Sequence, residues 1–159
     1  MPFQVVNAGL SGDTSSAGLD RLDYWISTPI DVFILELGIN DAIRGLPNSS
    51  IYLNLDNILK RVRLKHPRCK LAIIGMEIPK FLLSSKIDEF RGIFRKLAEH
   101  HHAEFVPFFL EGVAGIPHLN LRDGIHPTSK GYEIIAETAW PVIKALLEEN
   151  QTADRSTTI

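Results

Sequence analysis

The stretch DVFILELG, from Asp31 to Gly38, decides the fold because it is almost continuously apolar. A strand has this composition when both of its faces are buried, as in a parallel sheet covered by helices. A polar turn follows it, and then a helical pattern with four apolar residues on one face: Ile51, Leu55, Leu59 and Val62. A buried strand followed by an amphipathic helix is the repeating unit of α/β proteins.

The same alternation runs through the rest of the chain. Thr14 and Ser15 are candidate N-caps for a first helix. Apolar runs predict three more strands, at Phe3–Gly9, 69–76 and 103–109, and helical spacing predicts helices over 85–102 and from about Thr128. Strands that alternate with helices predict a parallel, doubly wound sheet with helices on both faces, and the chemistry of such sheets gathers beyond the carboxyl ends of the strands.

Length and composition predict one folded domain and exclude several classes of function. Of the 159 residues, 45% are hydrophobic and 23% are charged, with 17 basic against 19 acidic side chains. We expect a domain over residues 1–150 and a disordered tail over 151–159, where the sequence is polar and aperiodic. No basic stripe indicates nucleic acid, and no apolar run is long enough for stable membrane insertion. The single cysteine, Cys69, excludes a disulfide framework, and we expect it in the core.

One polar motif, NLRDGIHPTSKGY from Asn120 to Tyr132, contains an acid and a base three residues apart. Asp123 on this loop can orient the imidazole of His126, which leaves the second ring nitrogen to accept a proton from a nucleophile. The alternative is structural: Asp123 caps a turn, and His126 is an ordinary surface histidine before a proline.

Two other polar loops follow predicted strands. In LGIND, Asn40 comes shortly after an apolar strand and could place its side-chain amide over a developing oxyanion. In LSGDTS, Gly12 could offer an unobstructed backbone N–H. Either loop could instead be a turn that uses Gly and Asn for backbone reasons alone. Because all three motifs follow strands, we expect them at the same end of the sheet.

The order and spacing of the blocks NAGLSGDTS, LELGINDAIRG, VPFFLEGV and DGIHP resemble the SGNH (GDSL-type) hydrolases over nearly the whole chain. The resemblance is to the bacterial branch of acyl-CoA thioesterases, arylesterases and lysophospholipases. It implies a three-layer α/β/α sandwich of the flavodoxin-like SGNH type, without a cofactor or a metal. It implies that Asp123 and His126 are catalytic and that Gly12 and Asn40 form the oxyanion hole. Ile78, Phe81 and Leu82 would line the acyl-binding cleft, and the complete protein would be a monomer.

One block of that family has no counterpart. The resemblance implies a first strand ending in Gly-Asp-Ser, which lies in the family between the strands equivalent to Phe3–Ala8 and Asp31–Leu37, but no GDS occurs in the chain. We therefore expect that the nucleophilic serine and the first strand lie outside this chain, as in a reading frame truncated at its N-terminus. Any export signal would lie in the same segment, so localisation stays unknown.

Two other functions remain open at this point. A metal-dependent phosphoesterase could use a set of polar side chains from the three loops: Asp13, Asn40, Asp41, Asp123 and His126. A catalytically inactive binding module could occupy the same scaffold, since fold does not fix function. Three consecutive histidines, His100–His102, also invite a metal interpretation. Adjacent helical residues point in different directions, however, so we expect a structural role for them.

Overall fold

A computed structural model describes residues 3–76, 87–108, 110–124 and 126–156. Its elements, in chain order, are α1 (Ser15–Asp20), α2 (Leu22–Trp25), β1 (Val32–Leu35), α3 (Ile39–Ile43), α4 (Asn48–Lys65), β2 (Lys70–Ile74), α5 (Ile87–His101), β3 (Glu104–Val106) and α6 (Ser129–Ser156).

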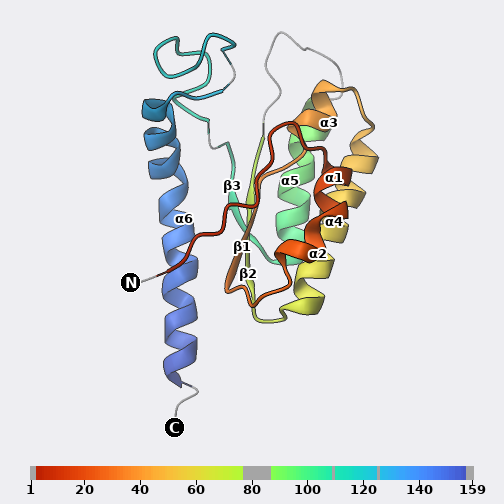
Figure 1. Ribbon diagram of the computed structural model, residues 1–159, viewed down its shortest axis with the longest axis vertical. Helices are drawn as coiled ribbons and strands as arrows, with labels where there is room; N and C mark the ends of the chain where they lie inside the picture. Colours follow the sequence, from red (N-terminus) through yellow and green to blue (C-terminus); the bar gives the residue numbers. More distant parts are fainter. Residues whose placement is uncertain (1–2, 77–86, 109, 125, 157–159) are drawn as a thin grey trace.

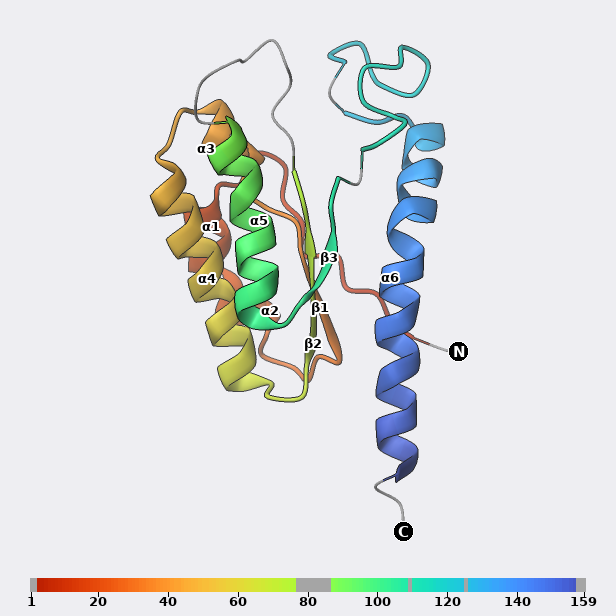
Figure 2. The same cartoon turned by 180° about the vertical axis from the view of Figure 1, so that it is seen from behind.

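The sheet is parallel and flanked by helices on both faces, as the alternating sequence pattern predicted. Its strands lie in the order β1-β2-β3, with Phe33 paired to Leu71 and Ile73 paired to Phe105. Helices α1, α2, α4 and α5 cover one face, and among the described residues α6 is the only helix on the other (Figures 1 and 2). Because the strands run parallel, the carboxyl ends of β1, β2 and β3 lie at the same end of the sheet.

The main core lies between the sheet and the pair α4 and α5. The apolar face of α4 that the sequence predicted is buried there, and Leu55 and Leu59 have no exposed surface. From α5, the rings of Phe90 and Phe94 meet edge to face with centroids 5.1 Å apart. Cys69 belongs to this core, which confirms its predicted burial. Fully burying side chains of this size contributes about 1.5–3 kcal/mol each, so this interface supplies much of the stability.

The strand predicted at Phe3–Gly9 is absent, and this prediction is wrong for the present structure. The segment runs alongside the sheet without pairing with it (Figure 1). Its backbone is held by side chains instead: Gly9 N–H donates to Asn7 Oδ1 at 2.9 Å, and Ala8 O accepts from Arg21 at 2.6 Å. A strand needs a neighbour to complete its ladder, and in the part of the chain that the structure describes β1 pairs only with β2.

Apolar side chains consequently remain exposed along this edge. Phe3, Val5 and Val6 are 50%, 77% and 62% exposed, and Ile34 of β1 is 42% exposed. Phe3 contacts the ring of Trp140 on α6, with centroids 6.2 Å apart. An apolar edge of this kind is a template for another strand.

Two further elements differ from the sequence prediction. The short helix α3 forms where a turn was expected, because Gly38 adopts a left-handed backbone (φ 119°) and lets the chain reverse directly into a helical turn. Helix α6 continues to Ser156, so 151–156 are helical although a disordered tail was expected from 151 onward. Neither Gly nor Pro interrupts the sequence between Pro141 and Ser156, so nothing in this stretch ends the helix earlier.

No helix in the described parts of the chain combines the length and the apolar character needed to cross a bilayer.

Candidate active site

The loop from Leu119 to Thr128 holds the acid and the base in direct contact. Asp123 Oδ2 lies 2.8 Å from His126 Nδ1, and Asp123 Oδ1 accepts the backbone N–H of His126 at 2.9 Å. Both side chains are substantially exposed, at 44% for the acid and 60% for the base. One carboxylate therefore fixes both the backbone and the ring of the histidine.

The hydrogen bond at Nδ1 determines what the imidazole can do. A carboxylate only accepts, so we assign the proton of the neutral ring to Nδ1. The lone pair then lies on Nε2, on the opposite side of the ring from Asp123. This is the tautomer that a general base requires, and a neighbouring carboxylate also stabilises the imidazolium that forms.

The same loop is anchored beneath the pair by its own backbone. Asn120 and Pro127 form an antiparallel bridge, Leu121 N–H donates to His126 O at 2.7 Å, and Gly124 turns the chain with φ 68°. Asn120 is buried and donates to Val113 O at 2.6 Å and Ile116 O at 2.8 Å.

The anchoring role of Asn120 was not expected from the sequence. Its only sequence signal is a polar residue between two leucines, in HLNLR.

A second small core supports this loop at the start of α6. Val113, Leu119 and Ile135 are buried together, and Thr128 N–H donates to Leu119 O at 2.8 Å. Gly131, in the first turn of α6, packs against the same carbonyl. The loop carrying the acid and base is thereby tied to α6, while α4 and α5 lie on the opposite face of the sheet.

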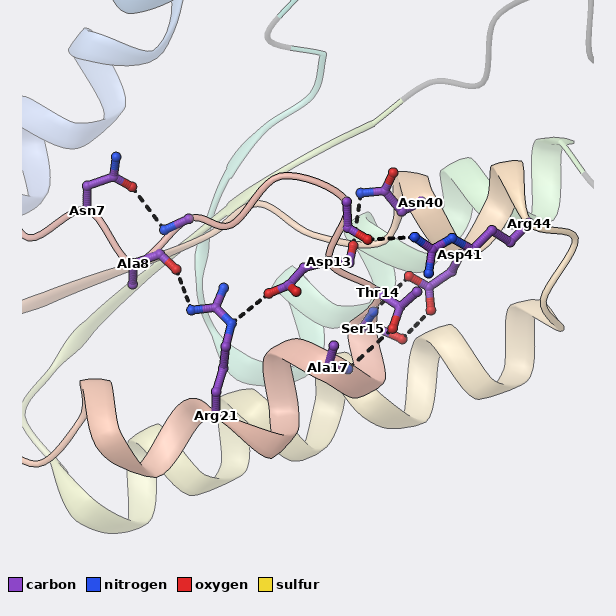
Figure 3. Close-up of polar contacts among 12 residues, drawn as sticks. Asn7, Ala8, Asp13, Thr14, Ser15, Ala17, Arg21, Asn40, Asp41 and Arg44 are labelled. Carbon is purple, nitrogen blue, oxygen red and sulfur yellow. Dashed lines mark hydrogen bonds and ion pairs between the residues drawn. The ribbon is translucent and has the colours of Figure 1, made fainter.

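The other pair of predicted residues, Gly12 and Asn40, also lies in one place. Asn40 Nδ2 donates to Asp13 O at 2.9 Å, and Arg44 donates to Gly12 O at 2.8 Å (Figure 3). Gly12 is exposed with φ 83°, and its N–H donates to no acceptor among the described residues. A free backbone N–H and an anchored side-chain amide are the donors that stabilise a developing oxyanion.

Arg21 is a further residue that sequence analysis missed. Its Nε contacts Asp13 Oδ2 at 2.6 Å, and another guanidinium nitrogen donates to Ala8 O. The ion pair is partly buried and joins α1 to the segment before it (Figure 3). It explains why Asp13 can be buried beside Gly12 without an uncompensated charge.

The two pairs share one end of the sheet. The loop before α1, helix α3 and the long loop between β3 and α6 all stand beyond the carboxyl ends of the strands (Figures 1 and 2). Asp123 is hydrogen-bonded directly to His126, and Asn40 is hydrogen-bonded to Asp13, the residue after Gly12. Ile78, Phe81 and Leu82, expected to line an acyl cleft, lie outside the described residues.

The donors that a metal-dependent phosphoesterase would need do not converge here. Asp13 is paired with Arg21, and Asp41 is turned towards Ser15. Across the described ranges, the only group of three or more His, Cys, Asp or Glu donors close enough to share an ion is Asp56, His100 and His101.

That group lies away from the predicted loops and is already occupied by internal contacts. Asp56 Oδ1 is 2.8 Å from His101 Nε2, and Asp56 Oδ2 is 2.6 Å from Lys60 Nζ. Burial lowers the pKa of His101, which favours a neutral ring donating to the carboxylate. Burial alone would raise the pKa of Asp56, but Lys60 and His101 outweigh it and lower that pKa. These contacts link α4 to α5, which supports the structural role expected for the histidine cluster.

A parallel sheet whose strand ends carry an Asp–His pair, a free backbone N–H and a side-chain amide has the arrangement expected of a hydrolase on a doubly wound α/β scaffold. The chain belongs to the GDSL-like lipase/acylhydrolase family, whose model matches residues 1–134.

Named relatives agree with this assignment. The chain is 34% identical over 146 residues to the esterase TesA of Pseudomonas aeruginosa, covering 91% of this chain and 72% of that protein. It is 36% identical to an arylesterase of Vibrio mimicus and 34% identical to thioesterase 1/protease 1/lysophospholipase L1 of Escherichia coli K12. Each of these two matches covers 84% of this chain, but only 66% and 64% of the relative, respectively.

Solved structures of related esterases are also similar to this chain in fold. A crystal structure of TesA superimposes with a TM-score of 0.85 at 33% identity, over 91% of this chain and 80% of that one. The structure of AlinE4, an SGNH-hydrolase family esterase, gives a TM-score of 0.70 at 36% identity, over 91% and 77%.

Proposed function

We propose that this chain carries the acid, the base and two oxyanion donors of a serine esterase whose nucleophilic serine lies outside it. The observation that carries the proposal is the contact between Asp123 Oδ2 and His126 Nδ1, at 2.8 Å. It leaves Nε2 as a base that can take the serine proton and later return it to the leaving group. Gly12 N–H and the Asn40 amide would then stabilise the oxyanion of the tetrahedral intermediate.

The described serines support an external nucleophile. No serine hydroxyl among them is hydrogen-bonded to His126. Ser15 is fully buried and donates to Asp41 at 2.6 Å, and Ser129 begins α6. Ser11 is exposed beside Gly12, but it is not on the strand-to-helix turn that activates a serine in other hydrolases.

The unpaired edge of β1 supports the same proposal from a different direction. Residues 3–10 do not join the sheet, and apolar side chains on them and on β1 are exposed. An additional strand placed between them would complete the ladder on both sides and cover those side chains. The carboxyl end of such a parallel strand would open towards Gly12 and Asn40, where a serine at its tip could meet His126.

The proposed substrates are carboxylic esters with an acyl or aryl part. The relatives are named esterase, arylesterase and thioesterase, so either an ester or a thioester fits the site. The chain has a net charge of −2 and no strongly basic patch, so we favour simple and aryl esters over highly anionic thioesters. Ile78, Phe81 and Leu82 are the proposed acyl-contacting residues.

The test restores the missing group and then removes the base. We expect the 159-residue chain alone to hydrolyse nitrophenyl esters at background, since loss of the serine lowers turnover by about 10⁶-fold in comparable enzymes. A strand ending in Gly-Asp-Ser, supplied in cis or as a separate peptide, should restore turnover and labelling by a fluorophosphonate. His126→Ala in the restored protein should abolish both.

Two outcomes would contradict the proposal. Burst-phase hydrolysis by the 159-residue chain, sensitive to His126→Ala, would show that a serine within it is the nucleophile. Substrate binding without labelling or turnover in the restored protein would favour a binding module. A panel of nitrophenyl esters and acyl-CoAs separates the substrate classes, and a clear preference for CoA thioesters would overturn the preference stated above.

A further inference from the structure

A buried hydrogen-bond network joins the two loops that carry Gly12 and Asn40. Asp41 Oδ2 accepts the backbone N–H of Ser15 at 2.7 Å, and Asp41 Oδ1 accepts the Ser15 hydroxyl at 2.6 Å (Figure 3). Asn54 of α4 donates to the same hydroxyl at 2.9 Å. The network thereby connects the first residue of α1 with α3 and α4.

The carboxylate at the centre of this network is deeply buried. Asp41 is 1% exposed and Ser15 is fully buried. Burial of a carboxylate costs several kcal/mol unless hydrogen bonds replace its water. Here both oxygens are bound by a single residue, and no Lys, Arg or His forms an ion pair with them in the described part of the chain. Such a bidentate, charge-assisted contact is short and allows little movement between its partners.

The two residues of this buried contact are close in sequence to the two proposed oxyanion donors. Asp41 follows Asn40 directly, and Ser15 lies three residues after Gly12. Two further bonds cross the same joint nearer to solvent: Asn40 Nδ2 to Asp13 O at 2.9 Å, and Arg44 to Gly12 O at 2.8 Å. Three contacts therefore join the two loops: an exposed one from Arg44, a partly buried one from Asn40 and a buried one between Asp41 and Ser15. Of these three, only the contact between Asp41 and Ser15 has both partners buried.

We propose that Asp41, acting through Ser15, is a positioning residue that sets the separation and direction of the two oxyanion donors, Gly12 N–H and the Asn40 amide. This inference rests on the proposed function, which gives those donors their role. One N–H of the Asn40 amide is held by Asp13 O, so the direction of the other depends on where the Gly12–Asp13 loop stands. Oxyanion stabilisation requires donors placed to within tenths of an ångström, and Asp41 keeps that loop in place.

The kinetic test uses Asp41→Asn in the chain restored with its serine. The amide has only one acceptor oxygen for the two Ser15 donors, so either the backbone N–H faces an NH₂ group or the hydroxyl must accept instead of donate, and the charge-assisted bidentate contact is lost. We expect kcat to fall by about ten- to a hundredfold while KM changes less than about threefold, because the displaced donors act on the transition state. Asp56→Asn is the matched control: it alters another buried aspartate, on α4, whose side chain contacts Lys60 and His101 instead of Ser15.

The control should lose stability but keep kcat within about threefold, since Asp56 contacts neither loop. An equal fall of kcat in both variants would overturn the proposal.

If Asp41→Asn does not fold, Asn54→Ala replaces it, because this variant removes only the amide that donates to the Ser15 hydroxyl. A fall of kcat by about threefold or more at constant KM supports the inference, and an unchanged kcat contradicts it.

A second readout separates this inference from the proposed function. In ¹⁵N-labelled chain, the Gly12 backbone amide and the Asn40 side-chain amide report directly on donor positions. Asp41→Asn should shift both sets of signals, and Asp56→Asn should leave both unmoved. If the restored enzyme is inactive, the esterase proposal fails, while these shifts still test the positioning role. Unchanged signals in Asp41→Asn would refute it.

Discussion

Replacing Gly131 by alanine should strain the contact that supports the acid–base loop. A Cβ added at Gly131 would overlap the carbonyl oxygen of Leu119 and lie 3.0 Å from Pro127 Cβ and 3.1 Å from Val113 Cγ1. The closest of these neighbours is backbone, and it belongs to the bridge that closes the loop, so it cannot move aside without shifting Asp123 and His126.

The expected magnitude is the difference between two opposing effects. Alanine gains at most about 1 kcal/mol over glycine in a helix. Overpacking a well-filled site costs about 1–3 kcal/mol, and a backbone neighbour places Gly131→Ala at the upper end. Gly92→Ala on α5 is the matched control, because a Cβ there would meet nothing within 4 Å. The first variant should lose about 1–2 kcal/mol, and the control should gain up to about 1 kcal/mol.

Urea and thermal unfolding of the two variants measure this difference directly. The resulting gap of about 1–3 kcal/mol corresponds to roughly 2–12 °C between their midpoints for a chain of this size. The same comparison in the restored enzyme should show reduced turnover for Gly131→Ala alone. Equal midpoints for the two variants would refute the close packing of α6 against Leu119.

Four further predictions follow from other contacts. Burial lowers the pKa of His101 below its ordinary 6.5, so the unfolded chain binds that proton at a higher pH than the folded chain does. The free energy of unfolding should therefore fall as the pH is lowered from 7 to 5, by at most about 1.4 kcal/mol per pH unit, and His101→Gln should flatten this slope. Burial raises the pKa of the Cys69 thiol to about 11, so Ellman's reagent should label it at pH 8 only after unfolding. Ile34→Lys places a charge on the open edge of β1 and should reduce self-association of the 159-residue chain in light scattering. In the restored enzyme, Asn40→Ala should lower kcat by about 10²–10³-fold, and a smaller loss would remove Asn40 from the oxyanion hole.

The elements that local patterns govern were predictable from the sequence. Thr14 was expected as an N-cap, and its side chain accepts from Ala17 N–H at 3.3 Å. The apolar face of α4 follows from its helical periodicity, and the buried β2 strand follows from its continuous apolar run. The pairing of Asp123 with His126 was also predictable, because both residues belong to one turn and their contact needs no other part of the fold.

The remaining features depend on distant parts of the chain. Phe3–Gly9 has the composition of a strand, yet a strand forms only beside a partner, and composition does not report one. The contact between Ser15 and Asp41 spans 26 positions, so neither motif alone indicates it. Gly38 and Asn40 suggested a turn, and the structure has the short helix α3 there, entered directly from the left-handed Gly38.

The double attachment of Asp123, to the backbone and to the ring of His126, means that acid and base travel together. As the loop moves, the position of Nε2 relative to a substrate changes, while Asp123 keeps the ring in the same orientation. The anchoring of the loop to α6, through Thr128 N–H and Leu119 O, should therefore govern how often Nε2 reaches the substrate. Asp123 should govern which ring nitrogen faces it.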